Sequence, residues 1–119
     1  MSLLACDPAR SAAYQTAAGR IRAADQRTAA SELDRLAAEV RRSVIRTIDR
    51  AGMGHIGGDL SVTDILVACF YGVLSVDPER PHWAGRDRFV LSKGHCAAAL
   101  YATLAHCGFF AAKELDTFM

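Results

Sequence analysis

Apolar side chains recur at helical spacing through the middle of the chain, and charged residues occupy the opposite side. The apolar positions are Leu33, Leu36, Ala37, Val40, Val44, Ile48 and Ala51. This pattern predicts one amphipathic helix that starts near Ser31 and buries one face. Ser31 with Asp34 forms a candidate capping box, and Gly52 is a candidate terminator.

A second helix is predicted to begin at Ser61, where Ser61 and Asp64 repeat the capping pattern ahead of an apolar run that reaches Leu74. A polar connection follows. It leads to the short run Phe-Val-Leu at residues 89–91, which is bounded by charge and by Ser-Lys-Gly. A short apolar run of this kind favours a buried strand of a parallel sheet.

The rest of the chain is predicted to be helical again. Residues 96–107 are rich in alanine and lead to Gly108, which suits a closely packed helix with a glycine terminator. A last short helix is predicted over residues 112–118. The order of helix, loop, helix, strand, loop and helix indicates an α/β fold with a parallel sheet, of which this portion is mostly helical.

The first thirty residues differ from the remainder. They are rich in Ala and Arg and could be helical by propensity, but they carry few large apolar side chains. We predict a frayed or partner-dependent arm over residues 1–30 and one folded domain over residues 31–119. With 119 residues, 51% of them hydrophobic, the chain has the size and composition of one ordinary globular domain.

Charge and cysteine spacing exclude several classes of function. A formal charge of +1 offers no electrostatic footprint for nucleic acid. The four cysteines form no CxxC pair, and neighbouring His-Cys residues on a helix point about 100° apart, so a zinc site is disfavoured. No apolar run approaches the roughly 20 residues that span a bilayer. The amino terminus lacks the order of a signal peptide. We predict a cytoplasmic protein without a membrane partner.

Two loops carry candidate chemistry. The stretch AGMGHIGGDLS, residues 51–61, places His55 among four glycines. In the second loop, Lys93, Gly94 and His95 follow the predicted strand and enter a helix, which is where open α/β sheets bind ligands. Helix starts favour anions, so a phosphate-bearing ligand is the natural candidate. The alternatives stay open: a turn histidine at position 55 and a plain helix-starting residue at position 95.

Three segments together carry a resemblance. GHIGGDLSVTDIL, VDPERPHWAGRDRFVLSKGH and LYATLAHCGFF closely resemble the amino-terminal, diphosphate-binding domain of transketolases, in the version often encoded as a separate subunit. The likeness covers about residues 33 to 119 in the right order. RFVLSKGH favours the transketolase branch over the related deoxyxylulose phosphate synthases.

The resemblance implies a fold, a reaction and site residues. The fold would be part of a three-layer thiamin diphosphate-binding domain with a parallel sheet. The enzyme would use thiamin diphosphate and Mg²⁺ to move a two-carbon ketol unit from a ketose phosphate to an aldose phosphate. His55 would be the catalytic and substrate-binding residue facing the donor sugar, and His95 with Gly94 would lie beside the cofactor diphosphate. Asp59 would add a carboxylate near the phosphorylated sugars and alter substrate preference. Many transketolases have proline where this chain has Ile56, a change also typical of the split-subunit relatives.

The resemblance also implies missing parts. The family's Gly-Asp-Gly metal ligands lie downstream of the matched segments, and the activating Glu belongs to a pyrimidine-binding domain. We therefore predict that the chain stops inside its domain, is inactive alone, and needs a carboxy-terminal transketolase subunit or domain in a dimer or heterotetramer. Two alternatives remain open. One is a non-catalytic helical module, and the other is a subunit of a specialised sugar or cyclitol pathway.

Overall fold

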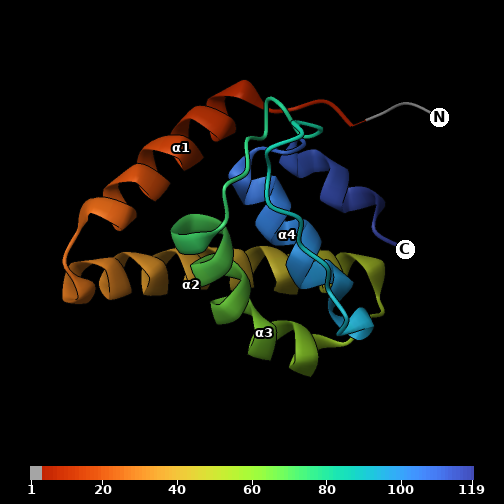
Figure 1. Ribbon diagram of the computed structural model, residues 1–119. Helices are drawn as coiled ribbons and strands as arrows, with labels where there is room; N and C mark the ends of the chain where they lie inside the picture. The colour runs from red at the N-terminus through yellow and green to blue at the C-terminus, as the bar shows by residue number, and fades with distance from the viewer. Residues whose placement is uncertain (1–3) are drawn as a thin grey trace.

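The computed structural model describes residues 4–119. Its α-helices are α1 (Pro8–Ala23), α2 (Gln26–Ala51), α3 (Ile56–Ala68) and α4 (Ala97–Cys107) (Figure 1). Shorter helical turns are a π-helical turn at Cys69–Val73 and 3-10 turns at Gly94–Cys96 and Ala112–Thr117. In Figure 1, α1 and α2 open into a V from their short connection, and α3 and α4 pack against α2.

The central amphipathic helix is confirmed as α2. Its predicted apolar face is buried through Leu36, Ala37, Val40 and Val44. Gly52 ends the helix in the left-handed conformation at φ 72°, as predicted. The predicted start is wrong, because α2 begins five residues before Ser31.

An earlier cap explains the earlier start of α2. Asp25 accepts the backbone N–H of Thr28 at 2.9 Å, which satisfies one of the free donors of the first turn. Ser31 lies inside the helix and is exposed. The predicted boundary between residues 30 and 31 therefore falls within α2.

Residues 1–30 contain the helix α1, so the predicted fraying is wrong for this part of the chain. Asp7 caps the helix by accepting the N–H of Arg10 at 3.2 Å. The Tyr14 hydroxyl donates to the carbonyl of Phe70 at 2.5 Å. The buried face consists of Ser11, Tyr14, Ala17, Ala18 and Ile21. Small side chains on this face let α1 approach the core closely, so few large apolar residues are needed.

The helix α3 and the turn that follows it form a long apolar stretch. By length and composition alone, the 18 residues Ile56–Val73 could cross a membrane, with a mean hydropathy of 1.4. Core helices of soluble proteins pass the same test. Leu66 and Val67 are fully buried against the other helices, and Asp59 lies in the first turn. One face of this stretch therefore belongs to the core, and 39% of the 18 residues are buried.

The predicted strand at residues 89–91 is not formed, and residues 4–119 contain no strand. Phe89 packs on Phe70 with ring centroids 5.4 Å apart, while Val90 is 85% exposed. A strand needs a neighbouring strand to pair its backbone groups, and the described residues offer none. The described part of the chain is thus helical, and the parallel sheet of the predicted α/β fold is not seen in it.

The carboxy-terminal predictions are confirmed in outline. The helix α4 ends at Gly108, which is left-handed at φ 92°. The predicted last helix is present as the 3-10 turn Ala112–Thr117. An ion pair between Arg50 and Asp116 joins this turn to the end of α2.

His106, in the last turn of α4, makes stability depend on pH. Its Nε2 lies 2.8 Å from the Ser43 hydroxyl, and burial lowers its pKa from the ordinary 6.5, with the positive charge of Arg10 acting in the same direction. A lowered pKa in the folded state means that the unfolded state binds more protons. The stabilisation is therefore complete above pH 6.5 and is lost as the pH falls through the folded-state pKa.

We expect the free energy of unfolding, measured in urea at several pH values between about 7.5 and 5, to decrease on acidification. His106→Gln keeps a hydrogen-bonding group near Ser43 and removes the titration, so its stability should depend less on pH. Parallel curves for the two proteins would contradict the role of His106.

Candidate active site

The two predicted site histidines lie side by side although they come from different elements. His55 is the residue that precedes α3, and His95 lies in the 3-10 turn that leads into α4. Their ring centroids are 4.6 Å apart with an interplanar angle of 50°. Both residues are exposed. The fold thus presents two imidazoles together, each with nitrogens that can donate or accept a hydrogen bond.

The glycine-rich stretch is only partly a loop. The sequence predicts that the second helix starts at Ser61, but α3 begins at Ile56, so Gly57 and Gly58 are helical. A Cβ on Gly58 would lie 2.9 Å from Cys96 Sγ. The absence of a side chain at Gly58 therefore lets the segment that carries His95 approach α3 closely.

Two polar contacts reinforce this approach. The Lys93 ammonium donates to the Ser61 hydroxyl at 2.8 Å, on the exposed side of the junction. On the buried side, the Asp59 carboxylate accepts the backbone N–H of Ala99 at 2.9 Å. Lys93 thus contacts α3 from the second loop.

Asp59 does not stand free in the loop as its predicted role beside phosphorylated sugars would suggest. Only 1% of its surface is exposed. Burial raises the pKa of its carboxyl, and the Ala99 N–H and the charges of His55 and Lys93 oppose that shift. Asp59 lies at the junction of two helix starts, and its predicted effect on substrate preference stays a prediction.

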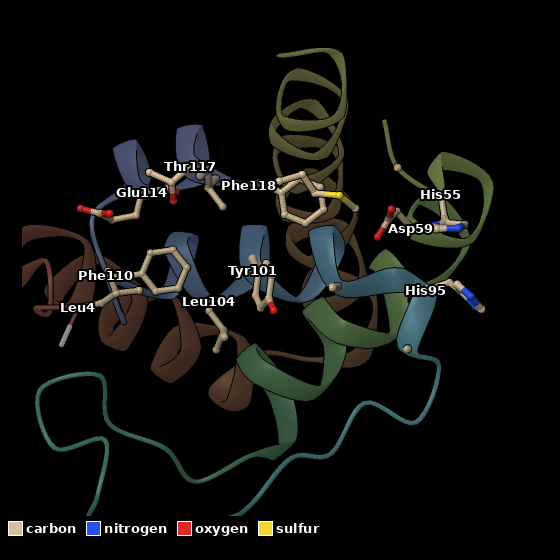
Figure 2. Close-up of a pocket in the computed structure, with 15 residues that line it drawn as sticks. Leu4, His55, Asp59, His95, Tyr101, Leu104, Phe110, Glu114, Thr117 and Phe118 are labelled. Atoms are coloured by element: carbon tan, nitrogen blue, oxygen red, sulfur yellow. The ribbon is translucent and has the colours of Figure 1, made fainter. Parts of the chain in front are cut away.

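A cavity of about 560 Å³ opens beside the histidine pair. Figure 2 shows His55 and His95 at one end of the cavity, with Asp59 near His55, and Phe110 and Leu4 at the other end. Gly94 also lines it. The long wall is apolar and is formed by Tyr101, Leu104, Phe110, Leu115 and Phe118. A ligand bound here would meet hydrogen-bonding groups at one end and apolar surface along its length.

Sequence reasoning missed the apolar wall. Tyr101 and Phe118 face each other with ring centroids 6.1 Å apart. Their spacing in α4 and in the last turn resembles that of core residues, so the sequence offers no signal that separates a cavity wall from a packed core. The two histidines, by contrast, were chosen as candidates from their motifs, and both line the cavity.

Comparison with known proteins identifies the domain. Residues 33–118 match the family model of the transketolase, thiamine diphosphate binding domain. The chain belongs to the transketolase family. The resemblance predicted from the sequence is thereby confirmed, and both histidines and the cavity wall up to Phe118 lie within the transketolase match, whereas α1 lies outside it.

Three transketolase relatives show how much of the family is present. The 6-deoxy-6-sulfo-D-fructose transketolase subunit of Clostridium sp. strain MSTE9 is 43% identical over 86 residues, which cover 72% of this chain and 31% of that protein. An apulose-4-phosphate transketolase subunit of Phocaeicola vulgatus is 44% identical over 77 residues, which cover 65% of this chain and 27% of that protein. Human transketolase is 43% identical over 79 residues, which cover 64% of this chain and 12% of that protein. The chain spans less than a third of the length of these transketolases.

Proposed function

We propose that this chain supplies the histidine-bearing part of a thiamin diphosphate site that transfers a two-carbon ketol unit from a ketose phosphate to an aldose. The observation that carries the proposal is the contact between His55 and His95 at one end of the cavity. The family match supports a thiamin diphosphate-binding domain. Activity would require further segments and a partner, because the chain spans less than a third of its relatives.

The residues at the cavity fit the proposed cofactor. A diphosphate needs hydrogen-bond donors, and the His95 imidazole at the cavity is such a donor. Gly94 leaves the backbone beside it open to close approach. The apolar wall suits the ring portions of the cofactor. When bound, thiamin diphosphate supplies the stabilisation of a carbanion, and the protein supplies orientation and electrostatics.

Each histidine has a separate proposed role. His95, together with Gly94, binds the diphosphate and orients it. His55 binds hydroxyl groups of the donor sugar and moves a proton at a ring nitrogen, which an imidazole can do near neutral pH. Because the ring centroids are 4.6 Å apart, the two histidines would contact adjacent parts of the bound cofactor and sugar.

The metal and the activating carboxylate would come from outside the described residues. Residues 4–119 hold no group of three or more His, Cys, Asp or Glu side chains placed to bind a metal ion. We propose that Mg²⁺ is held by ligands from the remainder of the domain, and that a carboxy-terminal subunit or domain provides the activating Glu in a dimer or heterotetramer. The names of two relatives, each a transketolase subunit, support a partner of this kind.

A specialised sugar is the second candidate within the same chemistry. The names of two relatives refer to 6-deoxy-6-sulfo-D-fructose and to apulose-4-phosphate. We propose that the donor belongs to this wider range of ketoses and not only to the pentose phosphates.

The four free cysteines fit a reducing compartment, which supports the cytoplasm as the location.

The test of this proposal uses a completed assembly. We define it as residues 1–118 of this chain fused to the downstream part of the Clostridium sp. relative and mixed with a carboxy-terminal transketolase subunit. With thiamin diphosphate and Mg²⁺, ketol transfer from a panel of ketose donors to an aldose should require both components. A folded assembly that neither transfers the unit from any donor nor binds the cofactor would contradict the proposal and favour a non-catalytic helical module.

A further inference from the structure

Asp59 is the most buried acidic residue near the histidine pair, and its contacts join two helices. Only 1% of its surface is exposed. Its backbone N–H donates to the carbonyl of His55 at 3.0 Å. Its side-chain Oδ1 accepts the N–H of Ala99, the third residue of α4, at 2.9 Å. One residue is therefore bonded both to the histidine before α3 and to the helix that follows His95.

The contact reaches the first turn of α4 from another helix. Cys96, which precedes α4, makes no capping hydrogen bond with its side chain. The first backbone N–H groups of a helix have no partner within the helix, and Asp59 satisfies one of them from α3. A carboxylate is favoured there because the N-terminal ends of both α3 and α4 are electropositive. These interactions offset part of the cost of burying the charge.

The other contacts across the same junction are of a different kind. Gly58 meets Cys96 only by close packing, and the Lys93 bond to Ser61 is exposed to solvent. Exposed contacts of charged side chains contribute little to stability. The bond from Ala99 to Asp59 is the buried polar link between the elements that carry His55 and His95.

We propose that Asp59 is a positioning residue, whose hydrogen bond to Ala99 holds the starts of α3 and α4 together and so sets the separation of His55 and His95. Asp59 also lines the cavity, and the role proposed for it is exerted through the histidines. The meaning of this role for catalysis rests on the proposed function. The contact between the rings is a property of the chain itself, so it can be measured without cofactor, substrate or partner.

The test compares three variants of the chain by NMR. Asp59→Ala removes the acceptor, and Asp59→Asn keeps a carbonyl acceptor while removing the charge. Asp64→Ala is the matched control, because Asp64 is an exposed acid on the same helix, paired with Arg41 at 2.7 Å. The readouts are through-space transfer between the His55 and His95 rings and the exchange rate of the Ala99 amide. Transfer between the Tyr14 and Tyr71 rings, 5.0 Å apart in the core, reports that the fold is intact.

Asp59→Ala should lose the signal between the two histidine rings and speed exchange of the Ala99 amide about tenfold or more, with the tyrosine signal kept. Asp59→Asn should restore the histidine signal, and Asp64→Ala should leave both readouts unchanged. A histidine signal and Ala99 exchange that are unchanged in Asp59→Ala would overturn the proposal.

If Asp59→Ala unfolds the chain, Asp59→Asn decides. A retained histidine signal supports positioning by the hydrogen bond, and its loss in a folded Asp59→Asn protein overturns it. Because no cofactor is present, this outcome is independent of whether the completed assembly binds thiamin diphosphate.

Discussion

Replacing His95 with alanine is expected to weaken thiamin diphosphate binding by the completed assembly by roughly 10- to 100-fold, the range for loss of a hydrogen bond to a charged group. Turnover at saturating cofactor should fall much less, because His95 is assigned to holding the diphosphate. The measurement is a calorimetric cofactor titration together with turnover at saturation.

His55→Ala should lower turnover and leave cofactor affinity nearly intact, the opposite of His95→Ala. Its turnover should fall about 100-fold or more, the range for a lost general acid–base group, with cofactor affinity nearly unchanged. His82→Ala is the matched control, because His82 is exposed in the connection before α4 and does not line the cavity. Equal effects of the two site variants on affinity and turnover, or effects no larger than that of His82→Ala, would contradict the separate roles.

Gly108→Ala is expected to destabilise the protein by about 3 kcal/mol, the combined scale of left-handed strain and overpacking. Gly108 ends α4 at φ 92°, where a side chain is strained. A Cβ there would also lie 2.8 Å from Ser11 Cα and 2.9 Å from the Arg10 carbonyl carbon, both backbone atoms of α1. The Gly108 carbonyl in turn accepts the N–H of Asp7 at 2.9 Å. The clash would therefore push α1 away from the core.

Gly52→Ala separates the two causes. Gly52 is also left-handed, at φ 72°, but nothing lies within 4 Å of a Cβ built on it. Gly52→Ala should lower the free energy of unfolding by about 1 kcal/mol, because only the strain of the left-handed backbone is added. Unfolding in urea measures both values. Equal losses for the two variants would show that the close approach of α1 at Gly108 does not matter.

The elements that were predicted well carry their signal in nearby residues. The buried face of α2 follows from apolar spacing, and the terminators Gly52 and Gly108 follow from the rarity of other residues in left-handed conformations. His55 and His95 were chosen as candidates from motifs, and their contact could not be predicted by spacing because it depends on how α3 and α4 pack.

The helix start at Ile56 could not be read from the chain. Gly57 and Gly58 have poor helix propensity, so local reasoning favours a loop. Packing overrides that preference, since Gly58 gives Cys96 room to approach and Asp59 joins the helix to Ala99. The same tertiary contact reveals the role of Asp59, which no local pattern indicates.

The predictions for the α1 segment and for a strand at residues 89–91 were wrong for different reasons. Asp7 and Pro8 form a start signal for α1 that was present in the sequence, because aspartate suits the cap and proline suits the first turn. The shortage of large apolar residues in this segment argued against a packed helix and obscured that signal. At residues 89–91 the apolar run is real, but strand formation depends on a neighbour that the described residues do not include.

The most direct measurement of the central claim is calorimetric titration of thiamin diphosphate and Mg²⁺ into the chain alone and into the completed assembly, each with His95 intact and with His95→Ala. We expect no measurable binding by the chain alone, binding by the completed assembly, and clear weakening of that binding in His95→Ala. Binding by the assembly that is unchanged when His95 is replaced, or no binding by a folded assembly, would contradict the claim that this chain supplies the histidine-bearing part of the site.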